Sequence, residues 1–499
     1  MMEKNMEQGK QGADNLAAGA KGGAIAFSLK ILSTGLGFLN QIILARILGA
    51  GGIGEVLLAL SIVKVAALIA KFGMEETMMR FVPLYIVRKD YARLKGTIYF
   101  ALQFCLLLSI FLGSLIWFFS GFISMDVFHS DGLLKLLPFI AVALPAGVLY
   151  EVIGGILKGY KDTFRALLPL FIISPFLRLV IFLLLSIRGG TPLYAVAAFL
   201  SAEIFSMLLS IVFLFKKTNK IRALKHGTEY KRVLNVAFAM IFTGVSAFLF
   251  TSTDLWIVGM FDSTEAVGIY GVTAKLVTLI VFSLGAFSTV IPPLISSIYA
   301  SNDLNELRKV VGKSTRWILS TAMPITLILM LEGDIILKYL FGEKFTGGYT
   351  ALLILCVGQL INAGCGLVGY LLQMTGGHKK YMKIALFWGV VNVILNIILV
   401  PRIGITGAAL STAFCLAMVN IVAMFAVYSK FSVLTLAEGL KFDIVFAAVV
   451  AFFYFLCRYN DFSPGYHILL GCSLTVYIWK SVVKNDIPWR LLFSKNKSG

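Results

Sequence analysis

The stretch GAGGIG, residues 49–54, carries glycines at the spacing G-x-G-x-x-G, which could support phosphate chemistry. In a dinucleotide-binding fold such glycines let the backbone approach a pyrophosphate, and an acidic residue about 20 positions later binds the ribose. Glu75 and Glu76 follow at about that distance. The motif needs a short strand before it, whereas the apolar run from Gly23 to Arg46 is much longer than a strand of about 4–8 residues. We therefore interpret the glycines as a tight turn between two membrane-spanning helices.

Metal-binding and ATP-binding patterns are missing from the sequence. The six cysteines show no C-x-x-C spacing and the four histidines form no H-E-x-x-H motif, so we predict no metal site. No G-x-x-x-x-G-K-[ST] motif is present, and we predict that the protein uses no cofactor. The cysteines are expected to be small core residues. They are Cys105, Cys356, Cys365, Cys415, Cys457 and Cys472.

The composition indicates a membrane protein. Of 499 residues, 59% are hydrophobic and 14% are charged, whereas soluble domains carry about 25% charged residues. Stretches long enough to cross about 30 Å of hydrocarbon recur along the chain, and we predict an all-α polytopic membrane protein with 14 transmembrane helices. These are expected at 23–45, 53–73, 96–120, 133–156, 166–187, 193–215, 233–258, 266–291, 315–332, 350–374, 381–400, 407–429, 442–457 and 466–483. The polar N-terminal tail lacks an apolar core, so we expect no signal peptide.

The distribution of Lys and Arg predicts the orientation. With the N-terminus inside, 29 of the 44 basic residues fall in inner segments, six in outer segments and nine within spans. We therefore predict a multi-pass protein of the cell (plasma or inner) membrane with both termini in the cytoplasm. The net charge of +19 then reflects basic loops facing anionic lipid headgroups rather than a nucleic-acid surface.

The chain contains an internal repeat. The first six spans and the next six begin at positions offset by 210 to 219 residues, and KGYKDTFR parallels TGGHKKYMK. An even number of spans keeps both halves in the same orientation, which predicts two parallel six-helix lobes facing each other across an axis normal to the membrane. The predicted divisions are a polar cytoplasmic tail at 1–22, an N-lobe (spans 1–6) at 23–215, a basic cytoplasmic linker at 216–232, a C-lobe (spans 7–12) at 233–429, and an appended helix pair (spans 13 and 14) with a cytoplasmic tail at 430–499.

Several diffuse motifs resemble one transporter family. The opening SLKILSTGLGFLNQIILARILGAGGIGEV, the segment RFVPLY and the A-R-x-L-G of residues 45–49 are similar to the polysaccharide-flippase branch of the multidrug/oligosaccharidyl-lipid/polysaccharide exporter superfamily. This resemblance implies the superfamily's two-lobed fold and a flippase, not an enzyme, that moves a polyprenyl-pyrophosphate-linked oligosaccharide from the inner to the outer leaflet. Lipid II flippases of the superfamily carry arginines in the first helix where this chain has Thr34 and Asn40, which argues against a peptidoglycan substrate.

Several of the basic residues within predicted spans are candidates for substrate binding, because a charge at the bilayer centre costs about 2.5–3.5 kcal/mol. We therefore expect them to face a cavity between the lobes, lined also by amides from other spans. Ammonium and guanidinium groups pair with pyrophosphate charge, while amides match sugar hydroxyls. The predicted substrate-binding residues are Lys30, Lys64, Lys71, Arg178, Lys275, Gln359, Asn362 and Asn392.

Three of the acidic residues within predicted spans leave alternatives open. They are Glu151, Glu203 and Asp254. Arg178 is expected either to face substrate or to pair with one of the two glutamates, and Asp254 either to couple an ion or to pair with Lys275. Lys71 either lines the cavity or extends to the inner interface. The amide stripes are alternatively hydrogen bonds between helices.

Two rival functions have specific signatures. A multidrug/cation exporter of the same superfamily would bind cations, which a cavity with several basic residues repels. A membrane glycan polymerase would be expected to carry a substantial loop with catalytic carboxylates or a metal site, and the sequence offers neither. The expected partners are the lipid-linked glycan, membrane lipids and other polysaccharide-assembly membrane proteins, with no nucleic acid and with the chain a monomer.

Overall fold

The computed structural model describes residues 2–219, 227 and 229–431, together with seven isolated positions beyond them. Those positions are 446, 449, 450, 452, 454, 473 and 477. Predicted spans 13 and 14 therefore lie almost wholly outside the described residues, as do Cys457, Cys472 and the centre of the basic linker.

All regular elements in this part of the chain are helices, as predicted. The chain divides into two compact units, Met1–Gly271 and Val272–Gly499. The elements of the first unit are α1 (Met2–Lys71), α2 (Met74–Val87), α3 (Tyr91–Phe118), α4 (Ser120–Phe122), η1 (Ile123–Val127), α5 (Asp131–Gly159), α6 (Thr163–Leu168), η2 (Pro169–Ile173), α7 (Ser174–Leu185), η3 (Ser186–Arg188), α8 (Pro192–Thr218), α9 (Tyr230–Thr251), α10 (Thr253–Phe261) and the first half of α11 (Thr264–Val277).

The second unit holds the remaining elements. They are the end of α11, α12 (Phe282–Ala300), α13 (Leu304–Leu331), α14 (Gly333–Leu340), η4 (Glu343–Gly348), α15 (Tyr349–Cys365), α16 (Val368–Leu372), η5 (Gln373–Gly377) and α17 (His378–Phe431). Within this unit α15 packs against α13 and α17. A Cβ atom on Gly358 would lie 2.7 Å from the Cα atom of Ala413, so the glycine is what lets α15 and α17 approach closely.

Eight helical stretches among the described residues are long and apolar enough to cross a membrane. Two of them, Ile25–Val87 and Val368–Phe431, contain 63 and 64 residues, and each joins two predicted spans across a kink. Predicted span 7 is divided between α9 and α10, and predicted span 8 between α11 and α12. The chain is thus a multi-pass membrane protein, while the total of 14 spans and the arrangement of two lobes stay predictions.

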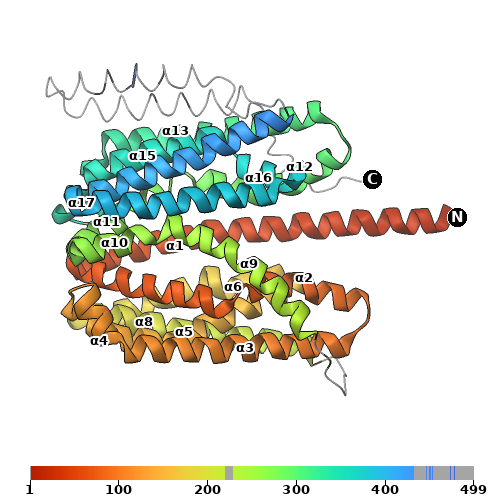
Figure 1. Cartoon of the computed structure of the whole chain (residues 1–499), viewed down its shortest axis with the longest axis horizontal. Coiled ribbons are helices and arrows are strands. Elements are labelled where there is room, and N and C mark those ends of the chain that lie inside the picture. The colour runs from red at the N-terminus through yellow and green to blue at the C-terminus, as the bar shows by residue number, and fades with distance from the viewer. Residues whose placement is uncertain are drawn as a thin grey trace. The chain divides into compact units, whose positions relative to one another are not determined.

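The glycine-rich stretch 49–54 lies inside α1, with helix on both sides. Gly49 has φ 69° and ψ −177°, which interrupts the helical geometry. Such a positive φ is open to glycine without steric cost. Figure 1 shows the red helix running from the N-terminus and the chain doubling back at its far end. The predicted turn between spans 1 and 2 is therefore present.

Helix α5 is the centre of the first unit and packs against α1, α2, α3 and α8. Its last turns carry a G-x-x-x-G pattern that faces α2. A Cβ atom on Gly155 would lie 2.4 Å from the carbonyl oxygen of Glu75, and one on Gly159 would lie 2.7 Å from Cβ of Val82. Glycines at this spacing allow two helix backbones to approach. The side chains that begin α2 are thereby placed beside those that end α5.

Candidate functional site

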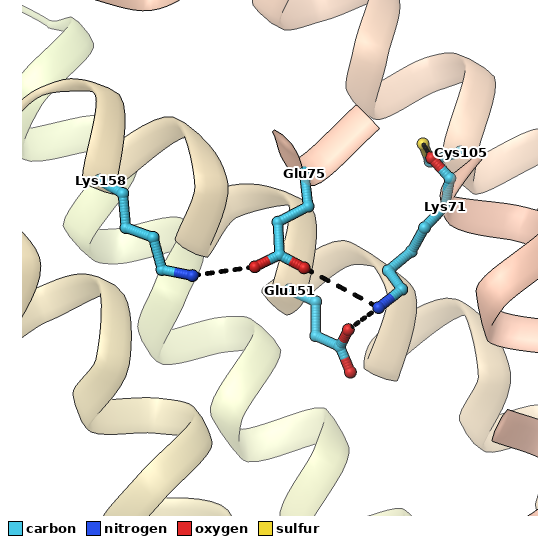
Figure 2. Close-up of polar contacts among 5 residues, drawn as sticks. All are labelled: Lys71, Glu75, Cys105, Glu151 and Lys158. Atoms are coloured by element: carbon cyan, nitrogen blue, oxygen red, sulfur yellow. Dashed lines mark hydrogen bonds and ion pairs between the residues drawn. The ribbon is translucent and has the colours of Figure 1, made fainter. Parts of the chain in front are cut away.

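Four charged side chains meet where α1, α2 and α5 come together. We call Lys71, Glu75, Glu151 and Lys158 the lysine–glutamate network (Figure 2). Lys71 pairs with Glu151, and its Nζ lies 3.8 Å from a carboxylate oxygen of Glu75. Lys158 Nζ donates to the other oxygen of Glu75 at 2.9 Å. Two cations and two anions alternate, so the network is neutral as a whole.

The junction between α1 and α2 positions half of this network. α1 ends at Lys71, after which Phe72 and Gly73 adopt φ values of 47° and 70°. α2 then begins, with Glu75 in its first turn, where the positive end of the helix dipole favours a carboxylate. The Sγ atom of Cys105 lies 3.6 Å from the Lys71 carbonyl oxygen and acts as a weak donor to this break.

Burial makes each member of the lysine–glutamate network dependent on the others. The four side chains are between 19% and 26% exposed, so their charges are largely removed from water. Removing one partner of such a pair leaves a charge without compensation. Lys71 is therefore held by carboxylates inside the first unit, and its contribution to substrate binding stays a prediction.

Arg178 pairs with Glu203, one of the two glutamates that the sequence offered as its partner. Glu203 lies on α8 and is 2% exposed, and it also accepts a hydrogen bond from Ser174 Oγ at 3.1 Å. The Arg178 guanidinium carbon lies 4.4 Å from the ring centroid of Phe199, close enough for a cation–π contact. Arg178 is thus bound on two sides within the first unit.

The other predicted basic residues are distributed over both units. Lys30 and Lys64 lie on α1, half-buried and exposed respectively, and belong to the first unit. Lys275 lies half-buried on α11 and belongs to the second unit. A cavity shared by all three lysines therefore stays a prediction.

Asp254 is buried in α10 and has a hydroxyl partner. Its carboxylate accepts a hydrogen bond from the Tyr270 hydroxyl at 2.8 Å. On the same helix, Trp256 Nε1 donates to Ser61 Oγ at 2.7 Å. These two bonds join α10 to α11 and to α1. Ion coupling by Asp254, and its pairing with Lys275, stay predictions.

The predicted amides of the second unit bond to neutral groups. Asn362 Nδ2 donates to Gln359 Oε1 at 2.9 Å on α15. Asn392 is fully buried and donates to Thr412 Oγ1 at 3.3 Å, across the kink that divides α17. Asn396 Nδ2 donates to the Asn392 carbonyl at 2.9 Å. Of these three bonds, the one from Asn392 to Thr412 joins two helical segments, whereas the other two lie within one helix. Binding of sugar hydroxyls by the same residues stays a prediction.

Sequence reasoning did not assign Glu75, Lys158 or Tyr270 to the site. Glu75 stands four residues after Lys71, and this spacing in a sequence expected to be helical is a usable signal for an ion pair. Lys158 is the first residue of the repeated segment KGYKDTFR. That segment indicated an internal repeat but did not indicate that Lys158 pairs with Glu75. The hydrogen bond from Tyr270 to Asp254 joins two different helices, so no local spacing in the sequence predicts it.

Asp162 lies just after the end of α5, outside the predicted membrane spans, and links two helices. Asp162 accepts a hydrogen bond from the Arg165 backbone N–H at 3.4 Å, and its carboxylate lies 3.0 Å from Lys217 Nζ. Burial by itself would raise the pKa of Asp162, but the hydrogen bonds from Lys217 and Arg165 outweigh it and hold the pKa below its ordinary value. The ionised carboxylate thus caps α6 and ties it to the end of α8.

The remaining reactive side chains are the cysteines and any groups that could bind a metal ion. Among the described residues, no group of three or more His, Cys, Asp and Glu side chains could hold a metal ion. Cys105, Cys356, Cys365 and Cys415 are free and buried, as expected for small core residues.

Comparison with known proteins identifies the family. A family model described as "Polysaccharide biosynthesis protein" matches residues 43–351. The chain is 22% identical over 412 residues to the "Probable low-salt glycan biosynthesis flippase Agl15" of Haloferax volcanii. The aligned region covers 79% of this chain and 80% of that protein. Among solved structures, the lipid II flippase MurJ in an inward closed conformation gives a TM-score of 0.71 at 19% identity, covering 93% of this chain and 99% of that one.

A multidrug resistance transporter of the MATE family in an inward-facing conformation is also similar, with a TM-score of 0.62 at 17% identity over 82% of this chain and 95% of that one. At such identities the two structural likenesses establish the fold, which a flippase and a drug transporter share. The family model spans more than half of the 499 residues. The chain therefore belongs to the polysaccharide biosynthesis protein family.

Proposed function

We propose that the protein is a flippase that moves a polyprenyl-pyrophosphate-linked oligosaccharide from the inner to the outer leaflet by alternating access, for cell-surface polysaccharide biosynthesis. The chain belongs to a family of membrane transporters and is not an enzyme. Our proposal includes 14 spans, both termini in the cytoplasm, residence in the plasma or inner membrane and a monomeric state.

The charge balance of the intramembrane residues is the observation that supports this proposal most. Two glutamates within predicted spans are paired inside the first unit, Glu151 with Lys71 and Glu203 with Arg178. Across the predicted spans as a whole, nine basic residues, among them Lys30, Lys64 and Lys275, stand against six acidic residues. An excess of positive charge at low dielectric favours an anionic substrate.

A pyrophosphate-linked sugar matches this excess. Ammonium groups form charge-assisted hydrogen bonds with phosphate oxygens, which are roughly twice as strong as neutral ones. Amides and hydroxyls of the second unit have both donors and acceptors for a glycan. The apolar carrier would remain in the bilayer, where the lipid-facing surfaces of the helices meet it.

The functions attributed to two similar proteins support the substrate class. Agl15 is described as a glycan biosynthesis flippase and MurJ as a lipid II flippase. At the first-helix positions Thr34 and Asn40, this chain has neutral side chains that bond to the protein backbone. Thr34 Oγ1 donates to the Lys30 carbonyl at 2.8 Å and Asn40 Nδ2 to the Pro175 carbonyl at 2.9 Å. We therefore propose a glycan other than the peptidoglycan precursor.

A multidrug/cation exporter is the second candidate, because the MATE likeness shows that the same fold serves drug transport. Positive charge in a cavity with low-dielectric walls repels cations. The intramembrane charge balance therefore favours the flippase over the exporter.

A translocation assay in proteoliposomes with a defined polyprenyl-pyrophosphate-linked oligosaccharide tests the function. Lys30→Ala, Lys64→Ala and Lys275→Ala should each slow translocation while the protein remains inserted and folded. Lys338→Ala is a matched control, because Lys338 is 53% exposed outside the predicted spans. Normal translocation by all three lysine variants would contradict the cavity, and failure of the wild type to move any such substrate would contradict the function.

A further inference from the structure

Helices α3 and α9 begin beside each other in the first unit and are joined by aromatic rings (Figure 1). The ring centroid of Phe100 on α3 lies 4.8 Å from that of Tyr230 on α9, edge to face. Further into the predicted spans, the rings of Phe104 on α3 and Phe238 on α9 both contact Phe72, at centroid distances of 5.6 and 6.2 Å. We call these five rings the aromatic seam. Its two sets of ring contacts show which residues of α3 and α9 lie at the same level.

Two exposed side-chain amides lie beside the aromatic seam, within the predicted spans. They are Gln103 on α3 and Asn235 on α9. Each lies between the two ring contacts of its own helix, so the two amides are at about the same depth. An amide exposed to hydrocarbon has lost water without gaining a hydrogen-bond partner, which is unfavourable. The pair of amides therefore indicates a polar ligand at this depth.

The two amides also lie on the same side of the aromatic seam. Gln103 stands about 200° around the helix from the buried Cys105 on α3. Asn235 likewise stands about 200° from the buried Ala237 on α9. Because the buried faces of both helices point into the first unit, both amides point away from it. A ligand lying along the outside of the seam therefore meets both amides.

The end of the seam where the two helices begin is open and positively charged. A cavity of about 380 Å³ opens there, lined by Glu229, Tyr230, Lys231 and Arg232. Lys231 is exposed, and Arg232 is 51% exposed and pairs with Glu229 at 2.9 Å. Glu229 also pairs with Arg93 at 3.1 Å. The predicted linker at 216–232 as a whole carries seven basic residues and one acidic residue, so basic groups predominate at this end of the seam.

We propose that the aromatic seam is a binding site for an anionic phospholipid of the inner leaflet. In the predicted topology the cavity faces the cytoplasm, and a basic pocket beside membrane helices on that side suits an anionic headgroup. The lipid phosphate accepts charge-assisted hydrogen bonds from Lys231 and Arg232. Asn235 lies four residues, about 6 Å, beyond Lys231. At that depth the amides donate to the ester oxygens of the lipid, and an acyl chain lies along the rings.

The two amides distinguish this ligand from others that carry phosphate. A soluble polyphosphate would account for the basic residues but not for amides placed within the membrane. A polyprenyl-pyrophosphate carrier has a phosphate and an apolar chain but no ester oxygens for the amides. The site goes beyond the proposed transport function, because its ligand belongs to the surrounding bilayer and is not the transported lipid.

Native mass spectrometry of the purified, full-length protein in detergent tests the site by lipid titration. The wild type should bind phosphatidylglycerol at least about tenfold more tightly than zwitterionic phosphatidylcholine. Lys231→Glu should weaken phosphatidylglycerol binding about tenfold or more, because repulsion is added to lost attraction. Lys309→Glu is the matched control, since Lys309 is an exposed lysine near the start of α13 in the second unit. Equal affinity for the two lipids, or unchanged affinity in Lys231→Glu, would overturn the site.

The amides are tested separately from the charges. Gln103→Leu and Asn235→Leu should each lower phosphatidylglycerol affinity about threefold, the effect of one neutral hydrogen bond in a membrane. Both side chains are exposed, so neither variant leaves a hole in the core, and thermal unfolding checks that both remain folded. Ser114→Ala is the control, because it removes an exposed hydroxyl from α3 farther from the cavity. Wild-type affinity in both leucine variants would overturn the site.

Competition identifies the source of the phosphate. Inorganic pyrophosphate and a polyprenyl-pyrophosphate-linked oligosaccharide are each added at the dissociation constant measured for phosphatidylglycerol. Neither should displace the bound phospholipid, because neither offers ester oxygens to the amides. Displacement by inorganic pyrophosphate would reveal a soluble-phosphate site, and displacement by the oligosaccharide a substrate site, and either would overturn the proposal. None of these measurements needs transport, so failure of the flippase function would leave the lipid site standing.

Discussion

The two units differ in how the polar side chains within predicted spans are bonded. In the first unit, the lysine–glutamate network and the pair of Arg178 with Glu203 balance full charges against one another. In the second unit, the pair of Gln359 with Asn362 and the chain from Asn396 through Asn392 to Thr412 use neutral amides and a hydroxyl. Charged pairs lose much when one partner is removed, whereas a neutral hydrogen bond in a membrane protein contributes about 0.6 kcal/mol. The first unit should therefore be far more sensitive to single polar substitutions.

The largest effect is expected at Glu203, the most buried member of a charged pair. Glu203→Gln should lower the free energy of unfolding by about 3 kcal/mol, because Arg178 is left without its counter-ion. Thermal unfolding in detergent measures the change, with Asp126→Asn on an exposed side chain as control. Combining Glu203→Leu with Arg178→Met should recover most of the loss. A double variant as unstable as Glu203→Gln would show that packing, not charge, explains the effect.

Glu151 should give the next largest effect. Glu151→Gln removes the carboxylate that pairs with Lys71, and we expect a loss of about 2 kcal/mol, less than for Glu203 because the side chain is 26% exposed. Glu76→Gln is the matched control, since Glu76 is exposed and only one residue from the network. Equal unfolding curves for Glu151→Gln and Glu76→Gln would show that the network contributes no stability.

A smaller effect is expected in the second unit. Asn392→Leu removes the hydrogen bond to Thr412 and should cost about 1 kcal/mol, within the range for interhelical hydrogen bonds in membranes. Thr412→Val tests the same bond from its other end. A loss at Asn392 as large as that at Glu203 would abolish the contrast between the two units.

The smallest effect is expected at Asp162, and it should depend on pH. Asp162→Asn should lower stability by about 0.5–1 kcal/mol at neutral pH, because Lys217 and Arg165 are partly exposed partners. The pKa of Asp162 is lowered in the folded protein, so its contribution is complete above the ordinary Asp pKa of about 3.9. The contribution disappears as the pH falls through the lowered pKa. A difference between variant and wild type that grows at low pH would contradict this sign.

Sequence patterns predicted much of the local structure and less of the site. Apolar length placed α3, α5 and α8 close to their observed bounds, and glycine chemistry predicted the turn at Gly49. The break inside predicted span 7 at Ser252 was not foreseen, because apolar length alone does not report where a helix is interrupted.

Some contacts of the candidate site could be predicted from neighbouring spans, whereas others depend on how distant helices pack. Neighbouring spans suggested Glu203 as a partner for Arg178, which the structure contains. Lys71 and Glu151 are 80 residues apart in the sequence. Their ion pair depends on the close approach of α2 to α5.

The sign of the charge that the transport pathway presents is the central claim, and a direct binding comparison tests it. Purified protein in detergent is offered an anionic polyprenyl-pyrophosphate-linked sugar and a lipophilic dye cation side by side. The wild type should bind the sugar and not the dye, and Lys275→Glu should weaken sugar binding more than Lys275→Ala does, because repulsion is added to lost attraction. Binding of the dye cation without binding of the lipid-linked sugar would contradict the flippase and favour the exporter.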